Sequence, residues 1–299
     1  MMAFRNVVFA GGGSRCFWQL GFWEGAIQSG LDLRSSVKFV GSTSAGCAMA
    51  SAAMLDRSTT ALNLFKDLTA KNPRNIHWQN LNPLRKAPLL PHARMYREAL
   101  ELLFGPDDLP TLNRISMHFL MSGAPKWLSG PASAALGLSI YGLEKAFSNP
   151  IHPKWPKLAG FRPIVGRAAD CKTVGEYINL VLAASRIPPL LPEGRHENED
   201  VLDGGLIDNV PTLLTTDEPG KTLVLLSMRY ESSLPSRPRM TYVQPSKPIK
   251  IDKFDYANPD GLQETFELGL VDGMRFAQEN RPQPQLRSGR ARERLEAIG

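Results

Sequence analysis

Cysteine is scarce in this 299-residue chain, which has only three. Cys16, Cys47 and Cys171 lie far apart and show no metal-ligand spacing. A disulfide framework is therefore not expected, and a reducing compartment is the default for such a protein. We expect a cytoplasmic location.

Long hydrophobic runs are also missing. No window approaches the roughly twenty apolar residues that a membrane-spanning helix needs. The N-terminal sequence MMAFRNVVFAGGG has neither the long apolar region nor the cleavage pattern of a signal peptide. Any membrane contact is therefore expected to be peripheral.

Extreme charge and extreme polarity are absent as well. Hydrophobic residues make up 42% of the chain and charged residues 21%, which is ordinary for a globular protein with a substantial core. The net charge of +6 would suit an anionic membrane surface, nucleic acid or simple solubility equally well. Because the basic residues are scattered except near the C-terminus, we expect no nucleic-acid partner. The oligomeric state is left open.

The first fifty residues alternate between apolar runs and helix-forming stretches. Residues 6–10 predict a central strand, and residues 17–30 predict a helix with Gly30 as its C-cap. A second strand begins at residues 38–40 and leads into another helix. This order is the βαβ pattern of a doubly wound sheet, so we expect a three-layer α/β/α fold with a mostly parallel central sheet.

The rest of the chain continues this alternation less regularly. Helices are expected over residues 59–68, 94–104, 174–184 and 260–279, strands over 115–121, 201–202 and 222–228, and loop or extended segments over 72–91, 151–166 and 234–250. We expect a single domain over residues 1–280, with a variable and lid-bearing part at 70–170, and a basic flexible tail at 281–299.

One stretch, residues 123–147, is small, apolar and almost uncharged. It suits either a buried helix or a lid exposed to lipid, and buried packing is the favoured interpretation. An aromatic cluster on the first helix raises the same choice between a membrane contact and the core, and again we favour the core. The cluster consists of Phe17, Trp18, Phe22 and Trp23.

The first motif that carries chemistry is GGGSR, residues 11–15, directly after the first strand. Successive glycines let backbone N–H groups converge on an anion, as in phosphate loops and oxyanion holes. Cys16 stands where the dinucleotide-binding pattern needs a glycine, and no phosphate-binding lysine follows. Nucleotide binding is therefore a poor alternative, and a plain tight turn is the other one.

The second motif is the turn around Ser44 in VKFVGSTSAGCAMA, residues 37–50. It nearly matches the nucleophile elbow G-x-S-x-G, in which a sharp strand-to-helix turn lifts a serine above the sheet. Gly46 fits the pattern, whereas Ser42 replaces the first glycine. The helix that follows points its N-terminus at the serine, which favours negative charge there.

The third motif is Asp203-Gly204-Gly205 after a short strand. A serine hydroxyl needs a base to accept its proton, and histidine is the usual base. The five histidines all lie in unpromising contexts; they are His77, His92, His118, His152 and His196. Asp203 can do this work directly if it lies within hydrogen-bond reach of Ser44.

A glycine loop with Arg15, an elbow serine and a distant DGG together resemble the patatin-like phospholipases, lipolytic acyl hydrolases with a Ser–Asp dyad. Residues 184–211, 254–255 and 267–273 also resemble the corresponding parts of that family. The likeness covers most of the chain and is clearest at residues 7–54 and 180–275.

The resemblance implies a patatin-like fold, a lipid substrate (phospholipid or lysophospholipid) and an acyl-enzyme formed without metal or organic cofactor. It assigns Ser44 as the nucleophile and Asp203 as the general base. Further implied roles are oxyanion or substrate binding for Gly11, Gly12, Gly13 and Arg15, and structural support for Gly46, Gly204 and Gly205. Arg15 would steady the loop or the phosphate head group.

Three residues depart from the family pattern: Ser42 and Cys16 replace glycines, and Ala10 stands where an aspartate is frequent. The first two substitutes are small and bear on the shape of the loops. They motivate a second hypothesis, a catalytically weak or silent lipid-binding or regulatory protein on the same fold. The acyl position cleaved and the head-group preference are left open.

Overall fold

The computed structural model describes residues 3–81, 88–125, 127–128, 130–148, 150–192, 195–197 and 199–280. In this part of the chain, seven strands form one mixed sheet in the order β4-β3-β2-β1-β6-β7, with β5 paired to β3. The strands are β1 (Phe4–Phe9), β2 (Phe39–Thr43), β3 (Ser116–Gly123), β4 (Arg162–Arg167), β5 (Val201–Asp203), β6 (Lys221–Leu225) and β7 (Met240–Val243).

The sheet is mostly parallel, as expected from the sequence. The pairs β1–β2, β2–β3, β1–β6 and β6–β7 are parallel, whereas β4 and β5 run antiparallel to β3. The helices are α1 (Phe17–Gln28), α2 (Leu33–Ser36), α3 (Ala45–Met54), α4 (Ser58–Ala70), α5 (His92–Leu103), α6 (Leu109–Arg114), α7 (Gly130–Ser148), α8 (Trp155–Leu158), α9 (Val174–Ala184), α10 (Gly205–Asp208) and α11 (Pro259–Glu279). Short 3-10 turns are η1 (Gly13–Cys16), η2 (Trp78–Leu81), η3 (Pro106–Asp108), η4 (Ala168–Asp170) and η5 (Thr212–Thr215).

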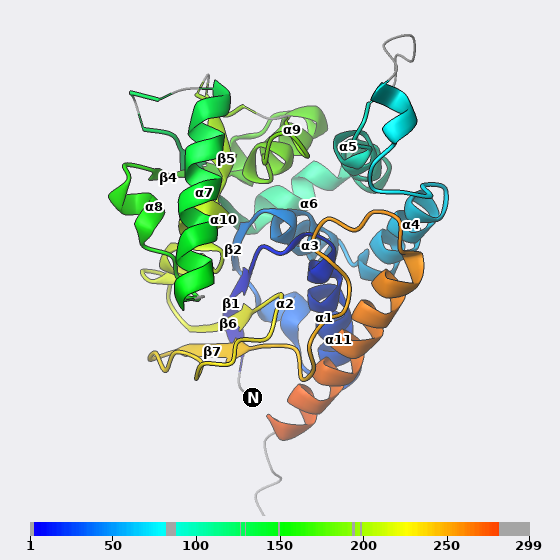
Figure 1. Cartoon of the computed structure of the whole chain (residues 1–299). Helices are drawn as coiled ribbons and strands as arrows, with labels where there is room; N and C mark the ends of the chain where they lie inside the picture. The colour runs from blue at the N-terminus through cyan, green and yellow to red at the C-terminus, as the bar shows by residue number, and fades with distance from the viewer. Residues whose placement is uncertain are drawn as a thin grey trace, which may run out of the picture.

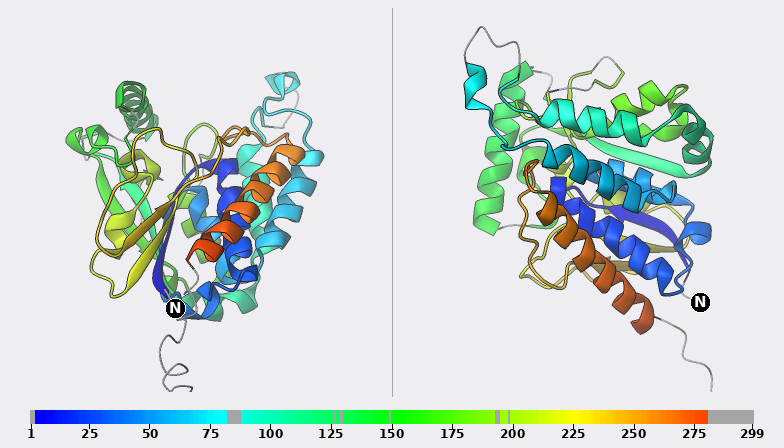
Figure 2. Two further views of the ribbon diagram at one scale, coloured as in Figure 1. Left: turned by 90° about the horizontal axis from the view of Figure 1, so that it is seen from below. Right: turned by 90° about the vertical axis from the view of Figure 1, so that its right-hand side faces the viewer.

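Helices cover both faces of the sheet, which gives the three layers (Figures 1 and 2). On one face lie α1, α11 and α4, with α3, α5 and α9 packed beside them, and on the other lie α7, α8 and α10. Successive side chains of β1 alternate between these layers, as strand geometry requires. Val7 and Phe9 enter the larger core with α1, and Val8 packs with Val210 and Val224 on the opposite side.

The first helix and the last one pack with almost no side chain between them. A Cβ added at Gly21 would lie 1.9 Å from the carbonyl oxygen of Phe266, and one added at Gly269 would lie 2.1 Å from that of Trp18. The indole N–H of Trp18 also donates to Asp272 at 2.9 Å. Close contact of the two backbones therefore fixes α11 against α1.

The aromatic cluster of the first helix belongs to the core. Phe17, Trp18, Phe22 and Trp23 are all at most 3% exposed. The favoured interpretation is confirmed, and a membrane contact through these four side chains is excluded. No helix in the described ranges is long and apolar enough to cross a membrane.

Two expectations for the middle of the chain are wrong. Residues 151–166 were expected to be a loop, yet they contain α8 and most of the edge strand β4. The apolar stretch at 123–147 was expected to be buried, but α7 buries Ala134 and leaves Leu143 54% exposed. This helix lies on the surface with one face packed down on β5 and α10 (Figure 1).

Residues 234–250 were expected to be extended, and the structure forms the strand β7 within them. The predicted tail at 281–299 lies outside the described residues.

Candidate active site

Ser44 stands at a sharp turn between β2 and α3. Its backbone has φ 54° and ψ −144°, an uncommon conformation for a residue other than glycine. Its N–H donates to the carbonyl of Ala184 at 3.1 Å, and Ser44 occupies the N-cap position of α3 without a side-chain capping hydrogen bond. Such local strain, held by surrounding contacts, is the geometry of a nucleophile elbow.

The residues on either side of Ser44 explain why the turn closes. A Cβ at Gly46 would lie 2.6 Å from the carbonyl oxygen of Phe9, so glycine is required where α3 leaves the sheet. Ser42 is fully buried, and its hydroxyl donates to the Cys47 sulfur at 3.4 Å. The small Ser42 side chain therefore fits beneath α3, and the turn is sharp despite the missing glycine.

The register of the sheet brings Asp203 to this turn. β2 pairs with β3 up to Thr43 opposite Leu120, and the chain then leaves the sheet at Ser44. β5 takes over the same edge of β3, with Asp203 opposite Met121, because β4 occupies the other edge. The ends of β2 and β5 therefore meet, and Asp203 faces the elbow.

The Asp203 carboxylate is buried and only partly satisfied. One oxygen, Oδ1, accepts the N–H of Gly205 at 2.6 Å. The other, Oδ2, has no partner in full hydrogen-bond geometry among the described residues. Burial raises the pKa of Asp203 to about 6, opposed by the nearby Ser44 hydroxyl, the hydrogen bond from Gly205 and the charge of Lys253. The Ser44 hydroxyl therefore faces a carboxylate whose pKa lies close to neutral.

Two glycines of the loop after β1 border the site. Gly12 and Gly13 line the pocket that contains Ser44 and Asp203. Gly13 has φ +57°, and a Cβ there would lie 2.0 Å from the carbonyl oxygen of Lys253. The N–H of Gly11 is already donated to the carbonyl of Asn209 at 3.0 Å. Gly11 therefore anchors the loop, and its expected part in the oxyanion hole does not fit the geometry.

Arg15 lies outside this pocket. Its Nε donates to the carbonyl of Ile251 at 2.9 Å, and its guanidinium is 3.4 Å from the carboxylate of Asp252. Of the two roles expected for Arg15, steadying the loop fits these contacts, and binding a head group beside Ser44 does not.

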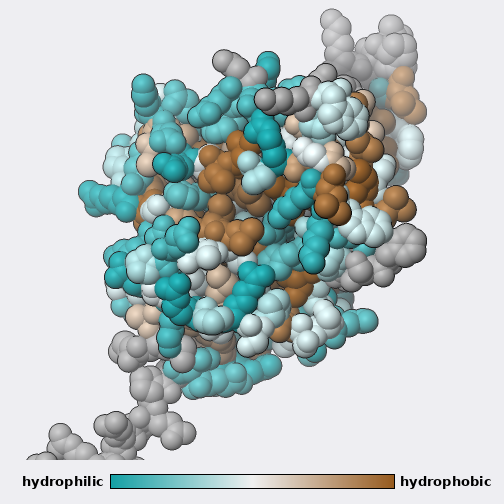
Figure 3. All heavy atoms as spheres, turned by 90° about the vertical axis from the view of Figure 1, so that its left-hand side faces the viewer, coloured by the Kyte–Doolittle hydropathy of each residue, from teal (hydrophilic) through white to brown (hydrophobic). Residues whose placement is uncertain are grey.

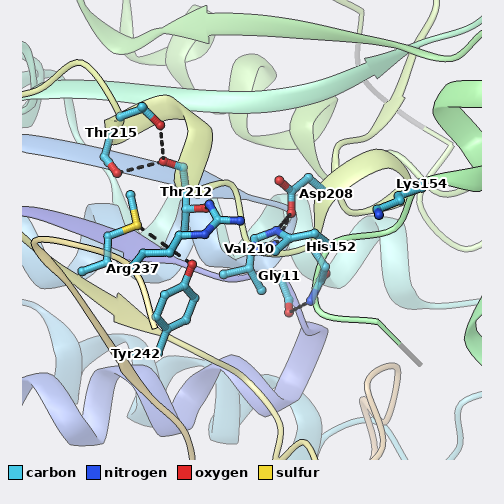
Figure 4. A network of polar contacts seen from close by, with 12 residues as sticks. Gly11, His152, Lys154, Asp208, Val210, Thr212, Thr215, Arg237 and Tyr242 are labelled. Atoms are coloured by element: carbon cyan, nitrogen blue, oxygen red, sulfur yellow. Dashed lines mark hydrogen bonds and ion pairs between the residues drawn. The ribbon is translucent and has the colours of Figure 1, made fainter. Parts of the chain in front are cut away.

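Two side chains behind the loop hold the carbonyl of Gly11, and Asp208 makes further contacts beside them. The Asn209 amide donates to the Gly11 carbonyl at 2.9 Å, and the Ser227 hydroxyl donates to the same oxygen. Asp208 accepts the N–H of Val210 at 3.1 Å and pairs with His152 at 2.9 Å between Oδ1 and Nδ1. Figure 4 shows Asp208 and His152 together, close to Gly11.

No histidine lines the pocket around Ser44 within the described ranges. His152 is engaged with Asp208, and His92 with the carbonyl of Phe254. Among the described residues that line this pocket, Asp203 is the one that carries a carboxylate.

The pocket itself contains about 700 Å³ of space, part of it open to solvent. One wall is a face of α7 made by Ala134, Leu138 and Tyr141. Burial raises the pKa of Tyr141 to about 12, with further contributions from Asp203 and Glu144. Tyr141, Asn209 and Lys253 were not predicted from the sequence, because no local motif connects them to Ser44. Of the three, only Asn209 had a signal, since it lies in DGGLIDNVP shortly after Asp203.

Sheet and site together define a three-layer α/β protein with a serine on a strand-to-helix elbow and a buried aspartate beside it. The family model of patatin-like phospholipases matches residues 7–216, which is more than half of the chain. The chain therefore belongs to the patatin-like phospholipase family. Membership supports a lipid acyl hydrolase in general.

Comparisons with individual proteins add little. The crystal structure of VipD from Legionella pneumophila is similar with a TM-score of 0.44 and 9% identity, covering 93% of this chain and 67% of that chain. A comparison with curated proteins gives no match.

Proposed function

We propose that the protein is a serine acyl hydrolase that cleaves carboxylic esters of phospholipids or lysophospholipids through Ser44 and Asp203. The observation that carries the proposal is the meeting of the strained serine with the buried, partly unsatisfied carboxylate at the ends of β2 and β5. Family membership supplies the substrate class.

In the first half-reaction, Ser44 attacks the ester carbonyl while Asp203 takes the hydroxyl proton. The N–H groups of Gly12 and Gly13, together with the N-terminus of α3, stabilise the oxyanion. The proton on Asp203 then passes to the departing alcohol. Water, activated by the same carboxylate, hydrolyses the acyl-enzyme in the second half-reaction.

The pKa of Asp203 suits this task. A general base works best when its pKa lies near the operating pH, since it is then ionised and still basic enough to accept a proton. A value of about 6 meets both requirements at neutral pH.

Ser44→Ala and Asp203→Asn test the proposal on a chromogenic short-chain ester and on phospholipid vesicles. Both variants should lose turnover, and Ser44→Ala should lose labelling by a fluorophosphonate probe. Ser139→Ala, at an exposed serine on α7, is the matched control. A protein that binds vesicles but neither labels nor turns over would instead be the silent lipid-binding protein considered above.

Contact with a lipid surface is part of this proposal. Trp155 and Leu158 of α8 are 41% and 85% exposed, and Lys154 and Lys157 flank them on the same short segment. Figure 3 looks onto this side, where brown apolar side chains gather among teal ones. Apolar side chains bordered by lysines suit an anionic lipid interface.

The double change Trp155→Ser and Leu158→Ser should reduce co-sedimentation with anionic vesicles. Val271→Ser, at a 53% exposed position of α11 in the other layer, is the control. Equal sedimentation of all three proteins would contradict contact through α8.

A further inference from the structure

A second apolar pocket lies next to the elbow, between α3, α4 and α5. It contains about 450 Å³ of space, part of it open to solvent. Gly13 lines both this pocket and the one containing Asp203, so the two meet at the loop that borders Ser44. Ala45, the residue directly after the nucleophile, lines only the second pocket.

The walls of the second pocket are mostly apolar. Ala48, Met49, Leu64 and Leu100 are typical of the wall. The hydroxyl of Tyr96, one of its few polar groups, already pairs with that of Ser185 at 3.2 Å. A hydrocarbon chain is the ligand that such a surface suits, because burying it removes apolar area from water at no cost in lost hydrogen bonds.

The first pocket also has apolar walls, with Leu138, Leu202 and Leu206 among them, but it differs from the second pocket near the nucleophile. Asp203, Asn209, Arg186 and Lys253 contribute polar groups to its lining. Under the proposed mechanism, Asp203 returns a proton to the departing alcohol, so the alcohol must leave on the Asp203 side of Ser44. The acyl part of the ester then extends away from Asp203.

We infer that the pocket between α3, α4 and α5 binds the fatty acyl chain that becomes attached to Ser44, while the Asp203 side receives the alcohol part of the lipid. This inference rests on the proposed function for the identity of the reaction, and it adds where the acyl chain lies and what limits its length.

Ala99 of α5 and Ala61 of α4 line the pocket on the helices across from α3, so a larger side chain at either position shortens the space left for the chain. Ala99→Leu should lower the ratio of kcat/KM for p-nitrophenyl octanoate over p-nitrophenyl acetate by about tenfold, if roughly two methylene groups are displaced. Ala134→Leu is the comparison variant for the other side of the site: Ala134 is also buried but lines the first pocket, so its effect on the two esters, which share one leaving group, should leave this ratio unchanged.

Binding without turnover provides an independent measurement. In a Ser44→Ala background, Ala99→Leu should weaken binding of a fluorescent long-chain fatty acid about tenfold, and Ala134→Leu should not. Ala61→Leu repeats the test from α4 if Ala99→Leu fails to give the thermal unfolding transition of the parent.

Unchanged ratios and unchanged probe binding in both Ala99→Leu and Ala61→Leu would overturn the inference. A loss confined to Ala134→Leu would overturn it too, by placing the acyl chain on the Asp203 side. Turnover surviving in Ser44→Ala would refute the proposed function alone, because fatty-acid binding is measured without catalysis.

Discussion

Asn209 hydrogen-bonds to both main-chain polar groups of Gly11. Its main-chain carbonyl accepts the Gly11 N–H at 3.0 Å, and its side-chain amide donates to the Gly11 carbonyl at 2.9 Å. The loop that borders Ser44 is therefore positioned from the segment that follows Asp203. The two halves of the site, about 200 residues apart in sequence, are coupled by one residue.

Asn209→Ala should lower kcat by roughly 10- to 100-fold with a smaller change in KM, because misplaced oxyanion donors act chiefly in the transition state. Ser227→Ala removes the other donor to the same carbonyl. The loss of kcat in the double variant should be less than the product of the losses in the two single variants, since both side chains hydrogen-bond to the same carbonyl oxygen. Strictly multiplicative losses in kcat would contradict a shared positioning role.

The pH profile of kcat/KM should rise through about pH 6, because Asp203 must be ionised to accept the serine proton. Lys253→Met should move this rise to higher pH, since the lysine charge lowers the pKa of Asp203. Lys250→Met, at an exposed lysine nearby in sequence, is the control. A rise that stays in place in Lys253→Met would contradict this electrostatic coupling.

Asp203→Asn should make the protein more stable as well as inactive. Burial raises the folded-state pKa of Asp203 from 3.8 to about 6, so the folded protein binds more protons than the unfolded chain between these values. The free energy of unfolding therefore falls as pH rises through this range, and the loss persists above it. The asparagine variant should avoid the loss and gain about 1–3 kcal/mol at neutral pH.

Urea unfolding of the parent protein and of Asp203→Asn, at about pH 4 and about pH 8, measures the free energy of unfolding of each. The difference in stability should be small at the lower pH and appear at the higher one. A variant that is less stable than the parent at the higher pH would show that the carboxylate is not strained by burial.

Gly269→Ala should destabilise the protein by about 3 kcal/mol or more, because its Cβ would lie 2.1 Å from the backbone oxygen of Trp18. Gly142→Ala on α7 is the matched control: a Cβ there meets no atom within 4 Å, so the change should stabilise α7 by roughly 1 kcal/mol. The midpoints of thermal unfolding of both variants test this difference in stability. Similar midpoints would mean that α1 and α11 separate more easily than their contact indicates.

The parts of the fold predicted from sequence are those set by local chemistry. The apolar run of β1, the turn of glycines and the small residues around Ser44 each specify their conformation within a few residues. For the same reason α9 was predicted with its observed bounds, Val174–Ala184.

What the sequence did not show depends on contacts between distant segments. β4 was missed because Pro163 suggested a loop, yet an edge strand tolerates proline where no ladder hydrogen bond is needed. Asn209 was missed because it works through hydrogen bonds to Gly11, 198 residues away. The side of β3 on which β5 pairs, which decides whether Asp203 meets Ser44, is likewise a property of the whole sheet.

The close packing of α1 against α11 has a consequence for the order of assembly. The helix α1, which follows the glycine loop, is synthesised well before Gly269 and Gly273, which contact it. Because N-terminal segments leave the ribosome first, α1 must wait for its partner. The backbone contacts that fix α1 behind the glycine loop can therefore form only after residue 273 has been translated.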